Sequence, residues 1–481
     1  MPKISPPLSN QVSNEQESEV RRQYEDYPFP RVVPDDEKRR LVVTPQDTLS
    51  KISHFCFEGK ANFNDNFRVL VAGGGTGHAL IFLAEQLSAT SAEIVYLDLS
   101  AQSMQIAQER AKIRKLRNIQ WHRGSILQAP DLNLGQFDYI NCTGVLHHLP
   151  DPTAGLQALK NCLKPSGAMG LMVYGKYGRT GIYQIQELMR LVNSGLTDNS
   201  SKVENTINIL KDLPVSHWQL RGKDKEQFLD SHLQDHHDIF DLFLHSKDQA
   251  YSVPEVYDYI ETCGLKVNAF THFHPDPTEL LKYEPRTFIK DKPLLERIRS
   301  FPKRNQMAVA ELLSADISLH TFYVSFRHTA TACINNLDNI PYLIHATSDS
   351  SPVFSTESFD DLSKSVAQNP NKPLIIRNPI APSILVPYTK YLASILQHLG
   401  GENTIEEIIQ MVQREFDAQN REAHHPTDIH REIKQLYHAL HSIGWMFLRH
   451  RSMPGPPCLR KLNKIKTSSF GHTPLNSQEI V

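Results

Sequence analysis

The sequence predicts an α/β fold, in which parallel strands alternate with helices. An apolar strand at Val69–Val71 breaks into a glycine-rich loop and then into an apolar helix. A second strand at 92–97 is followed by a helical pattern, and further short strands recur at 119–122 and 137–142. Strands and helices that alternate at this spacing are typical of strand-helix-strand units with parallel strands.

The loop after the first strand reads Ala72-Gly73-Gly74-Gly75-Thr76-Gly77-His78. Its glycines form the pattern G-x-G-x-G, and residues without a side chain let the backbone approach a bound nucleoside closely. The dinucleotide fingerprint needs its third glycine where this chain has His78. The loop therefore favours S-adenosylmethionine (SAM) over NAD, with a plain strand-to-helix turn as the alternative.

The second strand ends at Asp98, about twenty residues beyond the loop, where a carboxylate can hold two ribose hydroxyls. Ser100 is expected to cap the next helix, in which Met104, Ala107 and Ala111 recur at helical spacing. Asp98 is thus the candidate ribose ligand, and an ordinary loop carboxylate is the alternative.

The fourth-strand region supplies a family resemblance. Its sequence from Phe137 to Gly167, FDYINCTGVLHHLPDPTAGLQALKNCLKPSG, resembles that of class I SAM-dependent methyltransferases, with the glycine loop and Asp98 in the family's order. The resemblance covers residues 67–174 and implies a seven-stranded, Rossmann-like sheet, SAM as cofactor and methyl transfer as activity. Asp151 and Pro152 agree, because they can cap and open the helix that follows.

The resemblance also implies a set of cofactor contacts. Asp98 would hold the ribose hydroxyls, and Leu99 and Ile126 would sandwich the adenine. The family commonly has acidic residues where this chain has Val71 and Ser125. Each exchange removes a charge-assisted hydrogen bond, which leaves weak binding or a non-catalytic relative open. The expected cofactor-binding residues are Ala72, Gly73, Gly74, Gly75, Thr76, Gly77, Asp98, Leu99, Ser125, Ile126 and Thr143.

Methyl transfer requires proximity, orientation and, for a protonated nucleophile, a base. His147 and His148 follow the fourth strand, at the carboxyl edge where open α/β sheets bind ligands. One of them is a candidate for the acceptor pocket, and packing on the next helix is the alternative. Residues 143–146 lack the Asn-Pro-Pro-Tyr of many DNA methyltransferases, so no DNA substrate is expected.

Two N-terminal stretches precede this domain. Residues 1–20 are polar and predict a disordered tail without a signal peptide. Within a helical lid segment expected at 21–66, the sequence QYEDYPFPR is similar to a QYE-x-x-PYPR segment ahead of the catalytic domain in a group of bacterial methyltransferases. We expect a lid with Tyr24 and Tyr27 facing the sulfonium, and simple anchoring to the sheet is the alternative.

The methyltransferase domain is expected at 67–328 and contains a long insertion at 176–249. The insertion reads as helices, and insertions at a carboxyl edge usually form the substrate pocket. A stretch within and after it, DLFLHSKDQAYSV, resembles the same methyltransferase group and favours Asp241 and His245 as acceptor-pocket candidates. The expected catalytic residues are His147, His148, Tyr27 and His245.

Metal and disulfide chemistry are not expected. His232 and His236 stand four apart and could share a helical face, but no further ligand spacing fits a known metal motif. The six cysteines are dispersed without a C-x-x-C pair, which predicts reduced thiols.

The sequence of the C-terminal third predicts a linker at 329–369, a winged-helix-like accessory domain at 370–450 and a basic tail at 451–481. The signals for the accessory domain are helical patterns at 389–399, from Thr404 to Phe416 and from Asp428 to Ile443, then a strand at 445–448. This pattern faintly resembles the regulatory tail domains of some bacterial protein-lysine methyltransferases.

Composition narrows the remaining possibilities. The chain has 481 residues, 40% hydrophobic and 22% charged, with a net charge of -2, so it carries no general nucleic-acid footprint. No apolar run approaches the roughly 18 residues of a bilayer span, which predicts a cytoplasmic protein. We expect an unidentified methyl acceptor, first a small molecule and second a protein side chain recruited by the C-terminal domain. A non-catalytic interaction protein, an NAD oxidoreductase and the oligomeric state stay open.

Overall fold

A computed structural model describes residues 20–222, 224–233, 235–245, 247–273, 278–327, 330–343, 356–376, 384–418, 425–442, 444–454 and 466–469. The tail predicted at 1–20 lies outside this range except for residue 20, and so does most of the tail predicted at 451–481.

A seven-stranded path forms the central sheet, in the order β4-β3-β2-β5-β6-β9-β8, and the short β7 pairs with β6 beside it. Neighbouring strands are parallel except at β9, which runs antiparallel to both β6 and β8. This sheet confirms the predicted α/β fold with a seven-stranded, Rossmann-like sheet, whereas the winged-helix-like form of the C-terminal domain stays a prediction. The strands are β2 (Arg68–Ala72), β3 (Glu93–Asp98), β4 (Ile119–Arg123), β5 (Phe137–Thr143), β6 (Leu163–Gly175), β7 (Ala250–Tyr251), β8 (Lys266–Thr271) and β9 (Leu319–Ser325).

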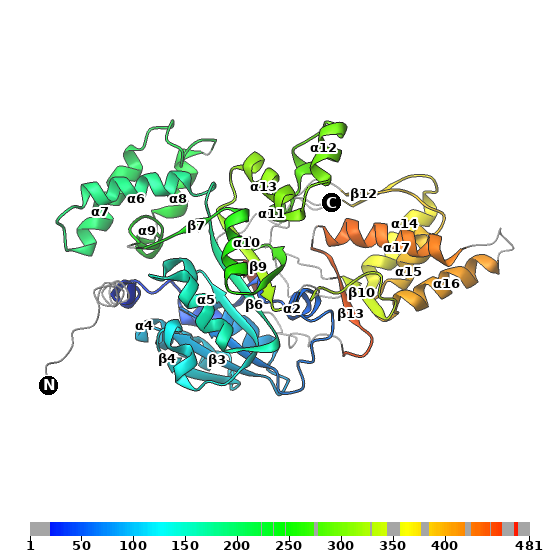
Figure 1. Cartoon of the computed structure of the whole chain (residues 1–481), viewed down its shortest axis with the longest axis horizontal. Helices are drawn as coiled ribbons and strands as arrows, with labels where there is room; N and C mark the ends of the chain where they lie inside the picture. Colours follow the sequence, from blue (N-terminus) through cyan, green and yellow to red (C-terminus); the bar gives the residue numbers. More distant parts are fainter. Residues whose placement is uncertain are drawn as a thin grey trace.

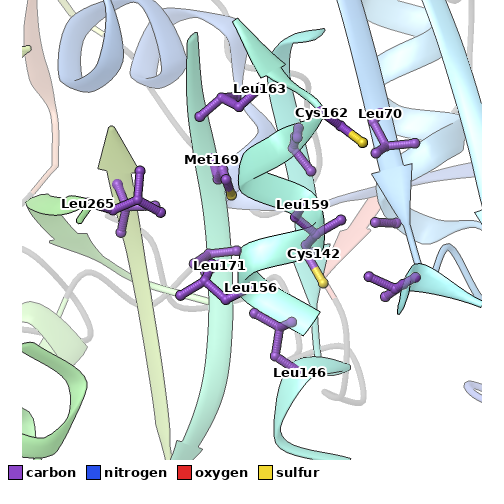
Figure 2. Packing of buried hydrophobic residues seen from close by; sticks show 14 of the residues in the cluster. Leu70, Cys142, Leu146, Leu156, Leu159, Cys162, Leu163, Met169, Leu171 and Leu265 are labelled. Carbon is purple, nitrogen blue, oxygen red and sulfur yellow. The ribbon is translucent and has the colours of Figure 1, made fainter. Parts of the chain in front are cut away.

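Successive residues of a strand pack into two different hydrophobic clusters, because the side chains of a strand alternate between the faces of the sheet. On β2, Leu70 packs with the cluster beneath α5 (Pro152–Asn161), whereas Val69 and Val71 pack with the cluster on the opposite face. Figure 2 shows the first cluster, where Leu156 and Leu159 of α5 lie beside Met169 and Leu171 of β6. The second face receives α2 (Leu49–Cys56) and α3 (His78–Gln86).

Helix caps fix where the remaining helices of this domain begin. Ser100 accepts a hydrogen bond from the Ser103 backbone and starts α4 (Ala101–Ile113), as the sequence predicts. Asp151 caps α5, and Ser252 forms a capping box at α10 (Val253–Thr262). The other short elements are η1 (Pro34–Lys38), η2 (Pro45–Asp47), η3 (Ile126–Leu132), η4 (Leu146–His148), α11 (Thr278–Leu281), η5 (Pro285–Thr287), α12 (Lys292–Arg299) and α13 (Lys303–Ser314).

The insertion forms a helical lobe with its own core. It comprises α6 (Thr180–Val192), α7 (Asn199–Asp212), α8 (Lys225–His232) and α9 (His236–Phe243). Ile185, Leu210 and Phe243 are buried within this core. The lobe lies at the opposite end of the molecule from the C-terminal helices (Figure 1).

The C-terminal part contains more regular structure than its sequence predicts. Residues expected as a linker include β10 (Asn339–Leu343) and α14 (Thr356–Gln368), and β10 pairs antiparallel with β13 (Met446–His450). Helix α14 escapes prediction because its polar sequence offers few apolar residues, of which Leu362 and Val366 pack on the C-terminal core. The other elements are β11 (Leu374–Ile376), β12 (Ile384–Val386), α15 (Leu392–His398), α16 (Ile405–Asp417) and α17 (Pro426–His441).

Helix α2 joins the two parts of the chain. All eight of its residues are buried, because the sheet covers one side and β13 covers the other. His54 of α2 accepts a hydrogen bond at Nδ1 from the Leu448 backbone, 3.0 Å away. Strand β1 (Arg40–Val43) also pairs in parallel with β14 (Lys466–Ser469) near the C-terminus. None of the described helices combines the length and the apolarity that a membrane span requires.

Candidate functional site

The glycine loop between β2 and α3 is tightly bent. Gly73, Gly75 and Gly77 have φ values of 71°, 50° and 96°, which favour glycine. A Cβ on Gly75 would lie 2.8 Å from the carbonyl oxygen of Phe29, and a Cβ on Gly74 would lie 2.3 Å from the ring of Tyr96. The lack of side chains at these glycines therefore leaves space for neighbouring protein atoms as well as for a ligand.

Asp98 lies at the end of β3, next to this loop. One carboxylate oxygen accepts a hydrogen bond from the Gly75 backbone at 2.7 Å, and the other accepts one from the Ser100 backbone at 2.8 Å. Burial raises the pKa of the Asp98 carboxyl, although both backbone donors oppose that shift. Each oxygen retains acceptor capacity, so the carboxylate can still receive two ribose hydroxyls.

The residues expected around the adenine have different surroundings. Ser125 caps η3 by accepting from the Leu127 backbone at 3.2 Å, which uses part of its acceptor capacity. Ile126 is buried, Leu99 is partly exposed, and Val71 packs inside the core. Thr143, at the end of β5, is held between the side chains of Asn141 and Gln46. Ala72 is fully buried at the end of β2.

Residues 20–31 form an N-terminal strap that crosses the glycine loop and the start of α4. The Glu25 carboxylate accepts hydrogen bonds from the backbones of Ala101 and Gln102 at 2.9 and 3.0 Å. Ser100 donates to the Tyr24 carbonyl at 3.0 Å, and Thr76 donates to the Pro30 carbonyl at 2.8 Å. A carboxylate at a helix N-terminus is a stabilising contact, so the strap docks through α4 as well as through the loop.

The two strap tyrosines point to different places in the insertion. The Tyr24 hydroxyl donates to Asp241 at 3.1 Å and lies 3.3 Å from Nε2 of His245. Tyr27 instead stacks on Phe240, with ring centroids 4.7 Å apart. Among the described contacts, Tyr27 meets none of the candidate histidines His147, His148 and His245.

The adjacent histidines of η4 also differ. His148 stacks on His245 with ring centroids 3.7 Å apart, and its Nδ1 lies 2.8 Å from the Lys247 carbonyl oxygen. His147 packs on Tyr174, and both of its ring nitrogens are buried without a hydrogen-bond partner among the described residues. We define the reaction cluster as Tyr24, His148, Asp241 and His245.

Burial dominates the electrostatics of the reaction cluster. It lowers the pKa of His148 to about 4 and holds the pKa of His245 well below its usual value, so both imidazoles are neutral. Burial also raises the pKa of Asp241 to about 6. Neutral imidazoles carry a lone pair and can accept a proton, which is what a general base requires.

A buried ion pair flanks the reaction cluster and was not predicted. Arg179 contacts Asp248 at 3.0 Å, and its guanidinium lies 3.5 Å from the ring centroid of Tyr174. Tyr174 is the penultimate residue of β6, so its position at the carboxyl edge was a usable signal. No local signal connects Arg179 to Asp248, because they are far apart in the sequence.

Two possible metal groups can be compared. The hypothesis that His232 and His236 share a helical face is wrong, because one ends α8 and the other begins α9. His148, Asp241 and His245, in contrast, have ligand atoms within 4.8 Å of one another.

Comparisons with known proteins agree with this fold. A family model described as "Methyltransferase domain" matches residues 70–169. The structure of PKMT2 from Rickettsia typhi covers 87% of this chain and 76% of its own, with TM-score 0.58 and 14% identity. The same protein in complex with AdoHcy gives TM-score 0.55 and 15% identity over 85% of this chain and 76% of its own.

Proteins with similar sequences match a shorter part of this chain. An uncharacterized protein of Synechococcus is 32% identical over 56% of this chain and 62% of its own length. A ubiquinone biosynthesis O-methyltransferase of Acinetobacter baylyi is 23% identical over 27% of this chain. The chain thus spans 62% and 55% of the lengths of these two relatives.

Proposed function

We propose that this chain is a class I SAM-dependent methyltransferase. The observation that carries the proposal is the Asp98 carboxylate, held by the Gly75 and Ser100 backbones beside a left-handed glycine loop. A carboxylate placed after the second strand of such a unit is suited to a ribose diol. The methyltransferase-domain match at 70–169 includes both features.

The cofactor residues follow from this placement. Asp98 would hold the ribose, and the loop from Ala72 to Gly77 would lie along the methionine and ribose portions. Leu99 and Ile126 would flank the adenine, with Ser125 and Thr143 at the margins of the site. SAM supplies a methyl group already activated by its sulfonium, so the protein's own task is to orient the acceptor and remove its proton.

His148 is the best-placed candidate base. It is neutral, and its Nδ1 is occupied by the Lys247 carbonyl, which leaves Nε2 with a lone pair. In the proposed step, a lone pair of the acceptor atom attacks the methyl carbon while the carbon-sulfur bond breaks and its electron pair remains on sulfur. The acceptor's proton moves to Nε2 of His148.

We propose a small-molecule acceptor, and protein side-chain methylation is the second candidate. The reaction cluster is enclosed by the strap and the insertion, which favours a small acceptor. The fold likeness to PKMT2 covers 87% of this chain and so extends beyond the methyltransferase domain. That extent supports a shared role for the C-terminal part, such as recruitment of a polypeptide.

Calorimetric titration with SAM, AdoHcy and NADH tests the proposal. We expect micromolar binding of SAM and AdoHcy, none of NADH, and loss of binding in Asp98→Ala, because the diol acceptor is removed. Asp131→Ala is the control, since Asp131 is an exposed carboxylate of η3. Equal AdoHcy affinity in wild type and Asp98→Ala would contradict the site, and absence of binding in wild type would favour a non-catalytic protein.

A further inference from the structure

The reaction cluster contains a hydrogen-bond chain that begins in the N-terminal strap. The Tyr24 hydroxyl donates its single proton to Asp241, 3.1 Å away. Its oxygen can then only accept from Nε2 of His245, 3.3 Å away. This contact requires a proton on Nε2 of His245.

A separate contact gives the same tautomer. The Lys247 backbone N–H donates to Nδ1 of His245 at 3.1 Å, so that nitrogen carries a lone pair. The carbonyl of Lys247 lies 2.8 Å from Nδ1 of His148, which must therefore carry a proton. The backbone of Lys247 thus holds the two stacked imidazoles in opposite tautomers. Of the two rings, only His148 keeps a lone pair on Nε2.

We propose that Tyr24 is a positioning residue for methyl transfer, through which the docked strap orients His245 and, by ring stacking, the base His148. This inference rests on the proposed function. It also narrows the acceptor to a molecule that presents a hydroxyl or a neutral amine, since Nε2 of His148 needs a proton donor. The strap therefore completes the reaction centre when it docks on the glycine loop and α4.

A metal ion at His148, Asp241 and His245 would be the competing use of these residues, since their ligand atoms lie within 4.8 Å of one another. A metal-bound imidazole must offer its lone pair to the ion and usually donates its other N–H to an oxygen. His245 does the opposite, because its Nδ1 accepts from a backbone N–H. The hydrogen bonds therefore favour the tyrosine chain over a metal.

Histidine-selective ¹⁵N NMR of the full chain tests this inference, with and without AdoHcy. We expect His148 to be protonated on Nδ1 and His245 on Nε2, with the signals assigned by His148→Asn and His245→Asn. Tyr24→Phe should remove the acceptor of the His245 Nε2–H and so shift the Nε2 proton and nitrogen signals of that ring, while the Lys247 N–H keeps the tautomer and AdoHcy affinity changes less than about threefold. Tyr27→Phe is the matched control in the same strap and should leave both tautomers unchanged.

Three outcomes would overturn the inference: unchanged His245 Nε2 signals in Tyr24→Phe, the same shift in Tyr27→Phe, or protonated Nδ1 on both rings with shifts on addition of zinc. Failure of the proposed function can be distinguished from failure of this inference about Tyr24. A wild type that binds no AdoHcy contradicts the function, whereas the two tautomers are still measured in the free protein.

Discussion

The cofactor cradle, which consists of the loop from Ala72 to Gly77 and Asp98, and the reaction cluster of the strap, η4 and the insertion are built differently. The cradle is made by backbone groups within about 25 residues of one another, around a single carboxylate. The reaction cluster is made by side chains from the strap, from η4 and from the region around α9. Ligand binding in the cradle should therefore depend on backbone shape, whereas the contacts of the reaction cluster should depend on protonation.

The largest effect is expected from Gly75→Val, which adds a branched side chain to the backbone of the cradle. Its positive φ of 50° and the Phe29 oxygen 2.8 Å from its Cβ position combine strain with overpacking. Together these effects raise the free energy of the native loop conformation by about 2–5 kcal/mol. The affinity for AdoHcy should therefore fall roughly a hundredfold or more in calorimetry. Gly195→Ala has a φ of 80° and no atom within 4 Å, so it should leave the affinity unchanged. Normal binding by the valine variant would show that the loop is not the cradle.

Arg110→Leu tests whether the cradle depends on a buried support. Arg110 donates to the Thr76 carbonyl at 2.7 Å and pairs with Glu37 at 2.6 Å. Glu37 keeps Arg114 as a partner. The loss of Arg110 therefore removes its charge-assisted hydrogen bonds to Glu37 and leaves the Thr76 carbonyl without its donor, which should destabilise the protein by about 3 kcal/mol in urea unfolding. The exposed Arg117→Leu should change stability by less than about 0.5 kcal/mol. Equal effects of the two variants would show that the buried ion pair is not a support.

Asp241→Asn tests the claim that the reaction cluster is sensitive to protonation. Tyr24, Arg179, Asp238, Asp248 and His245 surround this carboxyl, and burial raises its pKa from 3.8 to about 6. The folded state therefore binds the proton more tightly than the unfolded state. Relative to the variant, wild type should lose about 3 kcal/mol of unfolding free energy as the pH rises from 3.5 to 7. A pH-independent difference between the two proteins would contradict the burial of this charge.

The smallest expected effect separates the two histidines of η4. His147→Phe should change the unfolding free energy by less than about 1 kcal/mol, because its ring nitrogens have no hydrogen bonds to lose. His148→Phe should cost about 1–3 kcal/mol, because it leaves the Lys247 carbonyl without its donor. Thermal unfolding of both variants at pH 7.5 measures the difference, and the reverse order would contradict the assigned contacts.

The sequence predicts the cradle better than the cluster for a physical reason. Gly73, Gly75 and Asp98 belong to one strand-helix-strand unit, so local spacing is enough to bring them together. Tyr24 lies 217 residues from Asp241 and 221 from His245, and only the folded insertion joins them. Asp241 and His245 were predicted from resemblance, but their contact with the strap has no signature in the sequence.

Tyr27 shows the limit of a motif. The tyrosines of QYEDYPFPR were both expected to face the cofactor, yet Tyr27 packs into the core of the insertion on Phe240. Tyr24 lies within the helical residues 20–26, whereas Tyr27 follows them at a bend and packs against the apolar core of the insertion.

A crystal structure of the chain with AdoHcy is the most direct test of the central claim. We predict ribose hydroxyls on the Asp98 carboxylate, the strap docked over the nucleoside, and the sulfur facing the side of the site where His148 and Tyr24 lie. A nucleoside bound elsewhere, or a cleft beside Gly75 that stays closed by the strap with saturating AdoHcy present, would contradict the account.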